Sequence, residues 1–148
     1  MNVKNYARFE FMSLPENVAL ARSCVAALVS QLNCTLEDLE EVKLVVSEAV
    51  SNCIIHGYEH RRDGKISILV TIYDNRTVEI TISDFGKGIE DLDKALQPSF
   101  STDPARMGLG MTFMKSFMDE MEVNSVPNEG TSVRLRRSFL IGDQEAYA

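Results

Sequence analysis

The feature of the sequence that most constrains the fold is a stretch, residues 42–57, in which polar and apolar positions both repeat at helical spacing. Glu48, Asn52 and His56 follow one another at intervals of four residues, so on a helix they form one polar ridge. An apolar stripe borders this ridge and consists of Val42, Val46, Ala49 and Cys53. The pattern predicts a helix that packs on a core through the stripe and turns the ridge toward a cleft. The alternative is a helix at the edge of a core that carries these polar residues by chance.

Length and charge narrow the class of protein. The chain has 148 residues and a formal net charge of −7. We expect residues 1–148 to form a single domain with one core. The negative charge argues against direct nucleic-acid binding, which usually needs a basic face. The sequence has neither a run of about 18 apolar residues nor an apolar segment at its start, so we expect no membrane span, no secretory signal and a cytoplasmic location.

The cysteines and histidines do not suggest a disulfide or a zinc site. The three cysteines, Cys24, Cys34 and Cys53, form no close pair, and an odd number in such a chain indicates reduced thiols. Cys24 and Cys53 fall in apolar helical patterns, as small core residues do. His56 and His60 lack the H-E-x-x-H context of a zinc helix.

Periodicity and capping signals divide the chain into elements. Ser13, followed three residues later by Glu16, predicts a capping box at the start of a first helix, and Thr35 predicts the N-cap of a second. The predicted strands are residues 6–12, 65–74, 78–82, 122–125 and 131–139. The predicted helices run from the capping box to about residue 32, from 35 to 57 and from 108 to 121, with an irregular stretch at 97–107 and a frayed tail at 142–148.

The order of these elements predicts the architecture. Helices and strands are segregated along the chain, and neighbouring strands are joined by short turns rather than by helices. We therefore expect an α+β fold, a two-layer sandwich with a mostly antiparallel, mixed sheet and the helices packed on one face. No internal repeat or linker is visible, which agrees with one domain.

Four motifs follow one another along the chain and carry the candidate chemistry. The G-x-x-x-x-G-K-[ST] loop, the third glycine of a dinucleotide loop and the H-R-D loop of eukaryotic protein kinases are all absent. The chain holds instead an ordered set: E-x-x-x-N-x-x-x-H at 48–56, D-x-G-x-G at 84–88, G-x-G at 108–110 and the pair Gly130-Thr131.

This set resembles the nucleotide site of the GHKL superfamily of ATPases, which includes DNA gyrase, heat-shock chaperones, mismatch-repair ATPases and histidine kinases. Within that superfamily, VVSEAVSNCIIHGY at 45–58 and PNEGT at 127–131 resemble the bacterial anti-sigma-factor serine kinases of sporulation. The resemblance covers residues 9–135, and the combined motifs are far more specific than any one of them.

The resemblance implies both an activity and a set of partners. It implies a serine protein kinase that uses Mg²⁺ and ATP to phosphorylate an anti-anti-sigma factor. It also implies that the chain captures a sigma factor of the sigma-F type, exchanges partners as ATP and ADP exchange, and forms a homodimer through its N-terminal region. Arg22 lies in a segment that resembles the partner-binding face of the family. A solvated surface arginine is the alternative for Arg22.

At the phosphate end, each residue also has a chemical reason for its place. The amide oxygen of Asn52 suits Mg²⁺, a hard cation that needs few protein ligands when phosphates supply others. One helical turn away, Glu48 can act as the general base for an attacking hydroxyl. Gly108, Leu109 and Gly110 open a helix, where free backbone N–H groups favour phosphate. For His56, packing within the cleft is as good an interpretation as contact with phosphate.

At the base end, Asp84 ends a strand, and its carboxylate can accept a hydrogen bond from the amino group of adenine. Gly86 and Gly88 let the backbone turn and approach a ligand closely, although a plain turn would also use glycines. Thr131 can add a hydroxyl near the base, and an ordinary strand threonine is the alternative.

The chain departs from the family pattern in the segment expected to cover the phosphates, residues 100–107. This segment is shorter than the pattern by about two residues, and Thr102-Asp103-Pro104 stands where Lys-Pro is expected. Arg106 is the residue there that could neutralise phosphate charge, and the departure leaves that role open. The Met-rich helix that follows is better interpreted as core packing than as a ligand box.

Several functions from other classes remain as alternatives. They are the equivalent kinase of a stress-response sigma pathway, a gyrase-type mechanical ATPase, a detached histidine-kinase catalytic domain, and a nucleotide-gated binding module without catalysis. A mechanical ATPase needs a further domain to transmit closure. Histidine-kinase domains usually carry Asn where Glu48 stands.

Overall fold

The structure is a computed structural model that describes residues 1–91 and 106–139, except for the side chains of residues 106–109. In chain order the elements are β1 (Val3–Met12), α1 (Asn17–Val29), α2 (Leu36–Asn52), η1 (Cys53–Gly57), β2 (Lys65–Tyr73), β3 (Thr77–Asp84), α4 (Arg106–Phe117), β4 (Glu120–Val126) and β5 (Gly130–Ser138). The predicted tail at 142–148 and the covering segment up to residue 105 lie outside the described residues. No helix in the described ranges is long and apolar enough to cross a membrane.

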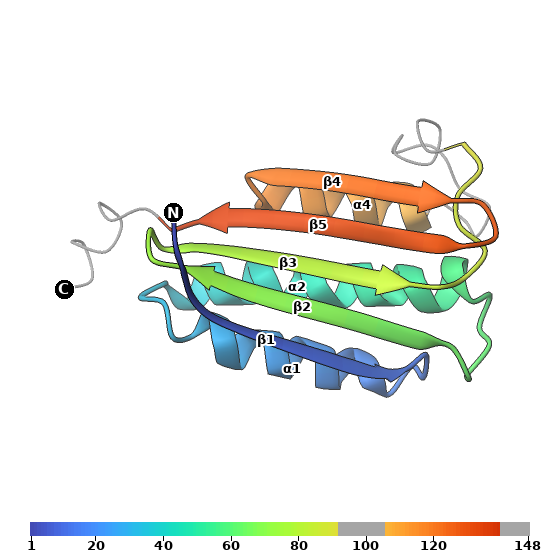
Figure 1. The fold of residues 1–148 in the computed structure, drawn as a ribbon, viewed down its shortest axis with the longest axis horizontal. Coiled ribbons are helices and arrows are strands. Elements are labelled where there is room, and N and C mark those ends of the chain that lie inside the picture. Colours follow the sequence, from blue (N-terminus) through green and yellow to red (C-terminus); the bar gives the residue numbers. More distant parts are fainter. Residues whose placement is uncertain (92–105, 140–148) are drawn as a thin grey trace.

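The strands form one five-stranded sheet in the order β1-β2-β3-β5-β4 (Figure 1). All four pairings between described strands are antiparallel, so this part of the chain contains none of the parallel pairing expected of a mixed sheet. The alternation seen in the sequence fixes the register, because Ile68 lies opposite Ile82 and Ile80 lies opposite Leu135. A slip of one residue would turn these side chains to the other face.

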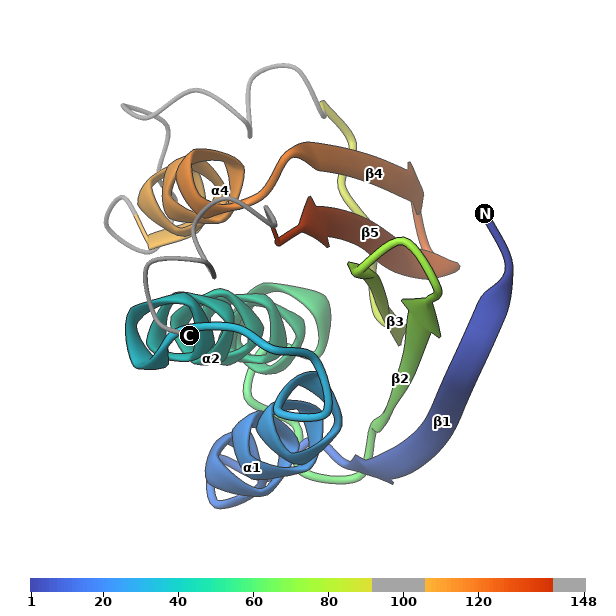
Figure 2. The same ribbon diagram turned by 90° about the vertical axis from the view of Figure 1, so that its left-hand side faces the viewer.

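The three α-helices all cover the same face of the sheet, with α2 between α1 and α4 (Figure 2). The core lies between the two layers, and Val25, Val46 and Ile68 within it are fully buried. The predicted α+β sandwich with helices on one face is therefore confirmed. The apolar stripe of the sequence explains the central position of α2, since Val42, Val46 and Ala49 all face the core.

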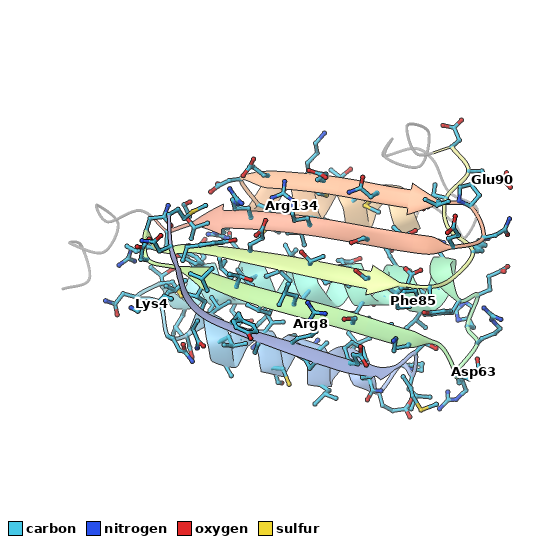
Figure 3. The ribbon with its side chains drawn as sticks, in the orientation of Figure 1. Lys4, Arg8, Asp63, Phe85, Glu90 and Arg134 are labelled. Carbon is cyan, nitrogen blue, oxygen red and sulfur yellow. The ribbon has the colours of Figure 1, made fainter. Side chains whose placement is uncertain are left out.

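Charged side chains cover the other face of the sheet, where Arg8 and Arg134 stand clear of the helices (Figure 3). Glu79 on β3 accepts hydrogen bonds from Arg134 at 2.6 Å, Arg136 at 3.3 Å and the Tyr73 hydroxyl at 2.9 Å. These partners lower the pKa of Glu79 even though its burial acts in the opposite direction. This network of cross-strand contacts pairs the charged side chains on the face of the sheet that no helix covers.

The two capping predictions had different outcomes. The side chain of Thr35 accepts a hydrogen bond from the Asp38 N–H at 2.9 Å, and the Thr35 N–H donates to Asp38 at 3.1 Å, so α2 begins with the expected N-cap. The capping box at Ser13 was wrong, because α1 begins only at Asn17. Ser13 is fully buried at the end of β1, where its Oγ donates to the Arg61 carbonyl and accepts from the Gly64 N–H. In this buried position the Ser13 hydroxyl holds the turn at residues 61–64.

Several element boundaries also differ from the predictions. Helix α4 begins two residues earlier than predicted and ends at Phe117, so Met121 belongs to β4. Helix α1 ends at Val29 instead of residue 32, and β1 begins at Val3 instead of residue 6. Helix α4 is cut short because the chain must reach the edge of the sheet, where Met121 pairs with Leu135. Tertiary pairing overrides helix propensity at these ends.

Arg137 joins three elements at the end of the fold where α2 begins. Its guanidinium contacts Asp38 at 2.6 Å and Glu41 at 2.9 Å, both on α2. It also donates to the carbonyl of Phe117, the last residue of α4, at 3.2 Å. Only 14% of the Arg137 side chain is exposed, so these contacts are partly shielded from water. They hold α2 and α4 against β5.

Replacing Arg137 with alanine should lower the free energy of unfolding by about 2 kcal/mol, because two shielded carboxylates and a helix-end carbonyl lose their partner. Urea denaturation measures this change. The matched control is Arg62→Ala, since Arg62 contacts Glu16 at 3.4 Å with 61% of its side chain exposed. That control should change stability by no more than about 0.5 kcal/mol. Equal effects of the two variants would contradict the assigned role of Arg137.

Candidate functional site

A cleft of about 480 Å³ opens where α2 ends, between the helix layer and the sheet. Five of the residues predicted to bind a ligand line it: Asn52, His56, Asp84, Gly88 and Thr131. The other lining residues, for which the sequence predicted no ligand role, are Ala49, Cys53, Gly57, Ile82, Lys87, Ile89, Glu90, Asp91, Met111, Asn128 and Val133. The volume lies in the range of small-molecule and cofactor sites. Residues of three of the four motifs, which are far apart in sequence, therefore border one cavity.

Glu48 and Gly110 are not among the lining residues of the cleft, but they lie together next to Asn52, which lines it. A Cβ atom on Gly110 would stand 3.0 Å from Oε2 of Glu48, 3.5 Å from Nδ2 of Asn52 and 3.7 Å from its Oδ1. The absence of a side chain at Gly110 therefore lets α4 approach the carboxylate and the amide of α2. The predicted base and the predicted metal ligand share one face of α2, a helical turn apart.

The side-chain amide of Asn52 has a nitrogen without a hydrogen-bond partner among the described residues, and this Nδ2 atom is buried. A buried amide group without a partner costs free energy. Because rotation by 180° about the last side-chain torsion exchanges the oxygen and the nitrogen, either atom can face the cleft. This unmet polar group borders the place where a ligand would lie.

The structure changes the interpretation of the glycines in α4. Since α4 begins at Arg106, Gly108 lies in its first turn, where backbone N–H groups have no acceptor within the helix. Gly110 is the fifth residue, so its N–H can reach the carbonyl of Arg106. Gly108 and Leu109 therefore keep their predicted place at a helix N-terminus, whereas Gly110 serves as the point of close approach. The side chain of Arg106 lies outside the described residues.

The polar ridge does not continue as an α-helix. After Asn52 the chain widens into η1, a π-helix in which the Tyr58 N–H donates to the Cys53 carbonyl at 2.9 Å. His56 lies on this wider turn, lines the cleft and is 9% exposed. Single π-turns inside helices are frequent at functional sites. Spacing in the sequence could not reveal this turn, because an α-helix and a π-helix use the same residue types.

Asp84 forms the buried acidic group of the cleft, with 6% of its surface exposed. Its Oδ1 accepts a hydrogen bond from the Gly86 N–H at 2.9 Å. Burial raises the pKa of Asp84 above its ordinary value, although backbone hydrogen bonds from Gly86 and Thr131 oppose this. A buried carboxylate held in this way can accept a further hydrogen bond from a ligand.

Two glycines after Asp84 are required by close approach. A Cβ on Gly86 would lie 2.1 Å from the carbonyl oxygen of Gly57, a distance that no real side chain allows. Gly88 has φ of +73°, and a Cβ there would lie 2.3 Å from the Val126 carbonyl oxygen. The glycines of the D-x-G-x-G motif thus press the loop against η1 and against the end of β4.

Tyr58 supports this loop, a role that was not predicted from the sequence. Its hydroxyl accepts from the Phe85 N–H at 2.7 Å and donates to the Lys65 carbonyl. A Cβ on Gly64 would lie 2.6 Å from the Tyr58 ring, so the ring is packed directly under that turn. The available signal was the position of Tyr58 next to Gly57, at the end of the helix that carries the ridge.

The remaining two predicted residues differ in location. Thr131 lines the cleft, and its hydroxyl lies 2.8 Å from the Ser125 hydroxyl of β4. Arg22 is not among the lining residues of the cleft, and its guanidinium donates to Ser47 on α2 at 3.1 Å. Ser47 precedes Glu48, so Arg22 contacts α2 at a point about 100° around the helix from Glu48.

Comparison with known proteins agrees with this geometry. The family model of the histidine kinase-like ATPase domain matches residues 11–137 of this chain. The anti-sigma F factor of Bacillus subtilis (strain 168) is 47% identical over 137 residues, which cover 91% of this chain and 93% of that protein. The anti-sigma F factor of Heyndrickxia coagulans is 47% identical over 141 residues, covering 94% and 96%. The chain belongs to the anti-sigma F factor family of histidine kinase-like ATPase domains. It is therefore a nucleotide-binding domain of the ATPase and kinase class.

Solved structures show the same fold at low identity. The RsbU and RsbW domains of Rv1364c from Mycobacterium tuberculosis match with a TM-score of 0.65 and 15% identity, covering 91% of this chain and 32% of that one. The catalytic domain of histidine kinase ThkA matches with a TM-score of 0.55 and 18% identity, covering 90% and 95%. At such identity the likeness establishes the fold alone.

The close approach at Gly110 generates a prediction in which stability and activity change in opposite directions. Gly110→Ala should stabilise α4 by up to about 1 kcal/mol, because alanine is the better helix former. The new methyl group should displace the Glu48 carboxylate by a few tenths of an ångström and lower ATP-dependent phosphoryl transfer about tenfold. Thermal unfolding and transfer from labelled ATP measure the two effects.

The matched control for this variant is Ser116→Ala. Ser116 lies on the exposed side of the same helix, where its hydroxyl donates only to the carbonyl of Thr112. This control should leave phosphoryl transfer unchanged. A Gly110→Ala variant with full transfer activity would show that the contact with Glu48 does not matter for the reaction.

Proposed function

We propose that the protein is an anti-sigma factor and a protein serine kinase that uses Mg²⁺ and ATP. It would hold a sigma factor of the sigma-F type and phosphorylate a serine of an anti-anti-sigma factor. The observation that carries the proposal is that Glu48 and Asn52, one turn apart on α2, both face the glycine contact of α4 beside the cleft. Family membership supports it, because relatives of 47% identity are anti-sigma F factors.

Glu48 serves as the general base in this proposal. Glu48 is half-buried and lies one helical turn from Asn52, which lines the cleft, so a serine hydroxyl from a partner protein can reach it from outside. When bound, ATP would supply the phosphoryl group and Mg²⁺ would neutralise the charge that develops on it. Glu48 takes the hydroxyl proton and orients the oxygen for attack, while α2 holds the carboxylate in place.

Asn52 is the proposed protein ligand of Mg²⁺. This ion needs only one or two protein oxygens when phosphates and water complete its shell. The buried, unpartnered amide of Asn52 fits that role, because rotation places its oxygen toward the cleft. The backbone N–H groups of Gly108 and Leu109, in the first turn of α4, would bind phosphate oxygens. Arg106 precedes them and is proposed to balance phosphate charge.

The base of the nucleotide is proposed to bind at Asp84. The buried carboxylate would accept a hydrogen bond from the amino group of adenine, and Thr131 would place its hydroxyl nearby. Gly86 and Gly88 shape the loop that closes over the ring. His56 also lines the cleft, and contact with phosphate is its proposed role.

Partner binding is proposed for the surface around Arg22 and for the N-terminal strand. Arg22 stands on α1 next to α2, so a partner docked there also reaches the exposed side of Glu48. Strand β1 is an edge of the sheet, and its Val3 and Tyr6 side chains are 57% and 65% exposed. An open edge with exposed apolar side chains can pair with a second copy, which supports the proposed homodimer.

The two main alternative functions differ from this proposal in different respects, one in its partners and the other in its chemistry. A kinase of a stress-response pathway would share every residue above and differ only in its partners. A nucleotide-gated binding module would leave ATP intact. The presence of a carboxylate at Glu48, at the edge of the cleft and in contact with α4, favours proton abstraction and hence the kinase.

Glu48→Gln should bind ATP with an affinity within about threefold of the original protein, yet lose transfer to serine by about 10²- to 10⁴-fold, because the amide cannot take a proton. Labelled ATP and the candidate anti-anti-sigma factor provide the assay. Label that survives acid identifies phosphoserine, whereas acid-labile label would identify phosphohistidine and a different kinase class. Glu40→Gln, on an exposed part of the same helix, is the control and should transfer normally.

Arg22→Ala should weaken capture of the sigma factor about tenfold, while ATP binding stays intact, because a partner loses a charged anchor. A pull-down titration measures capture. Ser47→Ala is the matched control, since it removes the bond between the two helices but keeps the arginine. If Ser47→Ala lost capture as strongly as Arg22→Ala, the arginine would act within the fold and not at the interface.

A further inference from the structure

Three large apolar side chains stand exposed at one end of the sheet, and the proposed function uses none of them. Met12 ends β1, Phe85 follows β3 and Val126 ends β4, with exposed fractions of 52%, 59% and 51%. Figure 1 shows these three strands ending at the same side of the sheet. Apolar residues that are scattered singly over a surface need no explanation, whereas a contiguous group marks an interaction surface.

The pairing of the strands places these side chains in one row. Met12 is paired with Lys65, and the Lys65 ammonium lies 5.0 Å from the centroid of the Phe85 ring. On the other side of Phe85, a Cβ on Gly130 would lie 2.9 Å from the Phe85 Cα atom, and Gly130 is paired with Val126. These five residues, which we call the end row, cross all five strands in the order of the sheet.

The end row lies on the face of the sheet that no helix covers. Side chains alternate along a strand, so Met12 shares the face of Arg8, which stands clear of the helices in Figure 3. By the same alternation Val126 shares the face of Glu122. The Lys65 ammonium contacts Glu10, also on the Arg8 face, at 3.7 Å. A second protein can therefore approach the row without displacing a helix.

The row is also nearly symmetrical about its centre. Phe85 extends the central strand, while Met12 and Val126 stand on the two edge strands. The strands between the centre and the edges carry opposite charges here. Lys65 begins β2, and Glu129 directly precedes β5, both with exposed side chains. A two-fold axis through Phe85 thus exchanges one apolar edge with the other and the cation with the anion.

We propose that the end row is a contact surface for a second copy of this chain. In an isologous contact a patch meets its own copy about a two-fold axis. Phe85 then meets Phe85 of the other copy, Met12 meets Val126, and Lys65 of each copy faces Glu129 of the other. Charge complementarity favours this occupant, because one surface supplies both members of each pair.

This contact is distinct from the proposed pairing of β1 edges. Edge pairing uses main-chain groups along the side of the sheet, whereas the end row uses side chains across its end. A chain that makes both contacts would join its dimers into larger assemblies. The inference concerns a surface outside the cleft and does not depend on the proposed kinase activity.

Sedimentation of the full chain at rising concentration and low salt measures the contact. Phe85→Ser removes the central apolar contact and should raise its dissociation constant at least tenfold. Lys65→Glu and Glu129→Lys each place like charges opposite one another and should weaken it similarly. Lys115→Glu makes the same change of charge on exposed α4, and this control should associate like the original protein. Thermal unfolding checks that every variant is folded.

Mixing the two charge variants gives the sharpest measurement. Lys65→Glu and Glu129→Lys should each fail to make the contact alone, whereas their one-to-one mixture should regain the original dissociation constant within about threefold. In the mixed pair, every facing couple is again opposite in charge. Neither a general effect of net charge nor a loss of folding produces such a rescue.

Three results would overturn the proposal. One is a mixture that associates no better than either variant alone, and another is self-association that Phe85→Ser leaves unchanged. The third is a Phe85→Ser variant that loses capture of the sigma factor while its self-association is intact, since the row would then serve a different protein. None of these results bears on the kinase, whose tests measure phosphoryl transfer.

Discussion

The structure depends on the backbone contact between Gly57 and Gly86. The Lys87 N–H donates to the Gly57 carbonyl at 2.9 Å, and no side chain can fit between the two glycines. This contact joins the end of the helix layer to the end of β3 in the sheet layer. The cleft lies where the two layers are joined in this way, so its shape follows from rigid elements as well as from its loops. Sites built on packed elements hold their geometry more closely than sites on loops alone.

The two ends of the cleft differ in their physical character. At the end near α4, the half-buried carboxylate of Glu48 and the amide of Asn52 meet a helix N-terminus, which suits a charged ligand group and an incoming hydroxyl. At the other end, Asp84 is buried and held by neutral donors. A ligand with a charged part and a flat polar ring matches this division. A second protein needs access only to the end near α4, where its hydroxyl would meet Glu48.

Much of the fold could be predicted from the sequence because its core residues have a clear period. The strict alternation in β2 and β3 gave the hairpin, and the stripe on α2 gave the face that packs on the sheet. Ser13 shows the limit of local signals, since its pattern is that of a helix cap while its burial ties it to a turn 48 residues away. The end of α4 at Phe117 was likewise set by another element, because Met121 pairs with Leu135 in the sheet.

The sequence by itself determined the candidate residues and the family, because the spacing of Glu48, Asn52 and the glycine motifs is a local property of the chain. Only the tertiary structure decided how these residues meet. It placed Gly110 against Glu48, put His56 on a π-helix and packed Gly86 against Gly57. Contacts of this kind depend on packing between segments tens of residues apart, and no local pattern encodes the distance between two such segments.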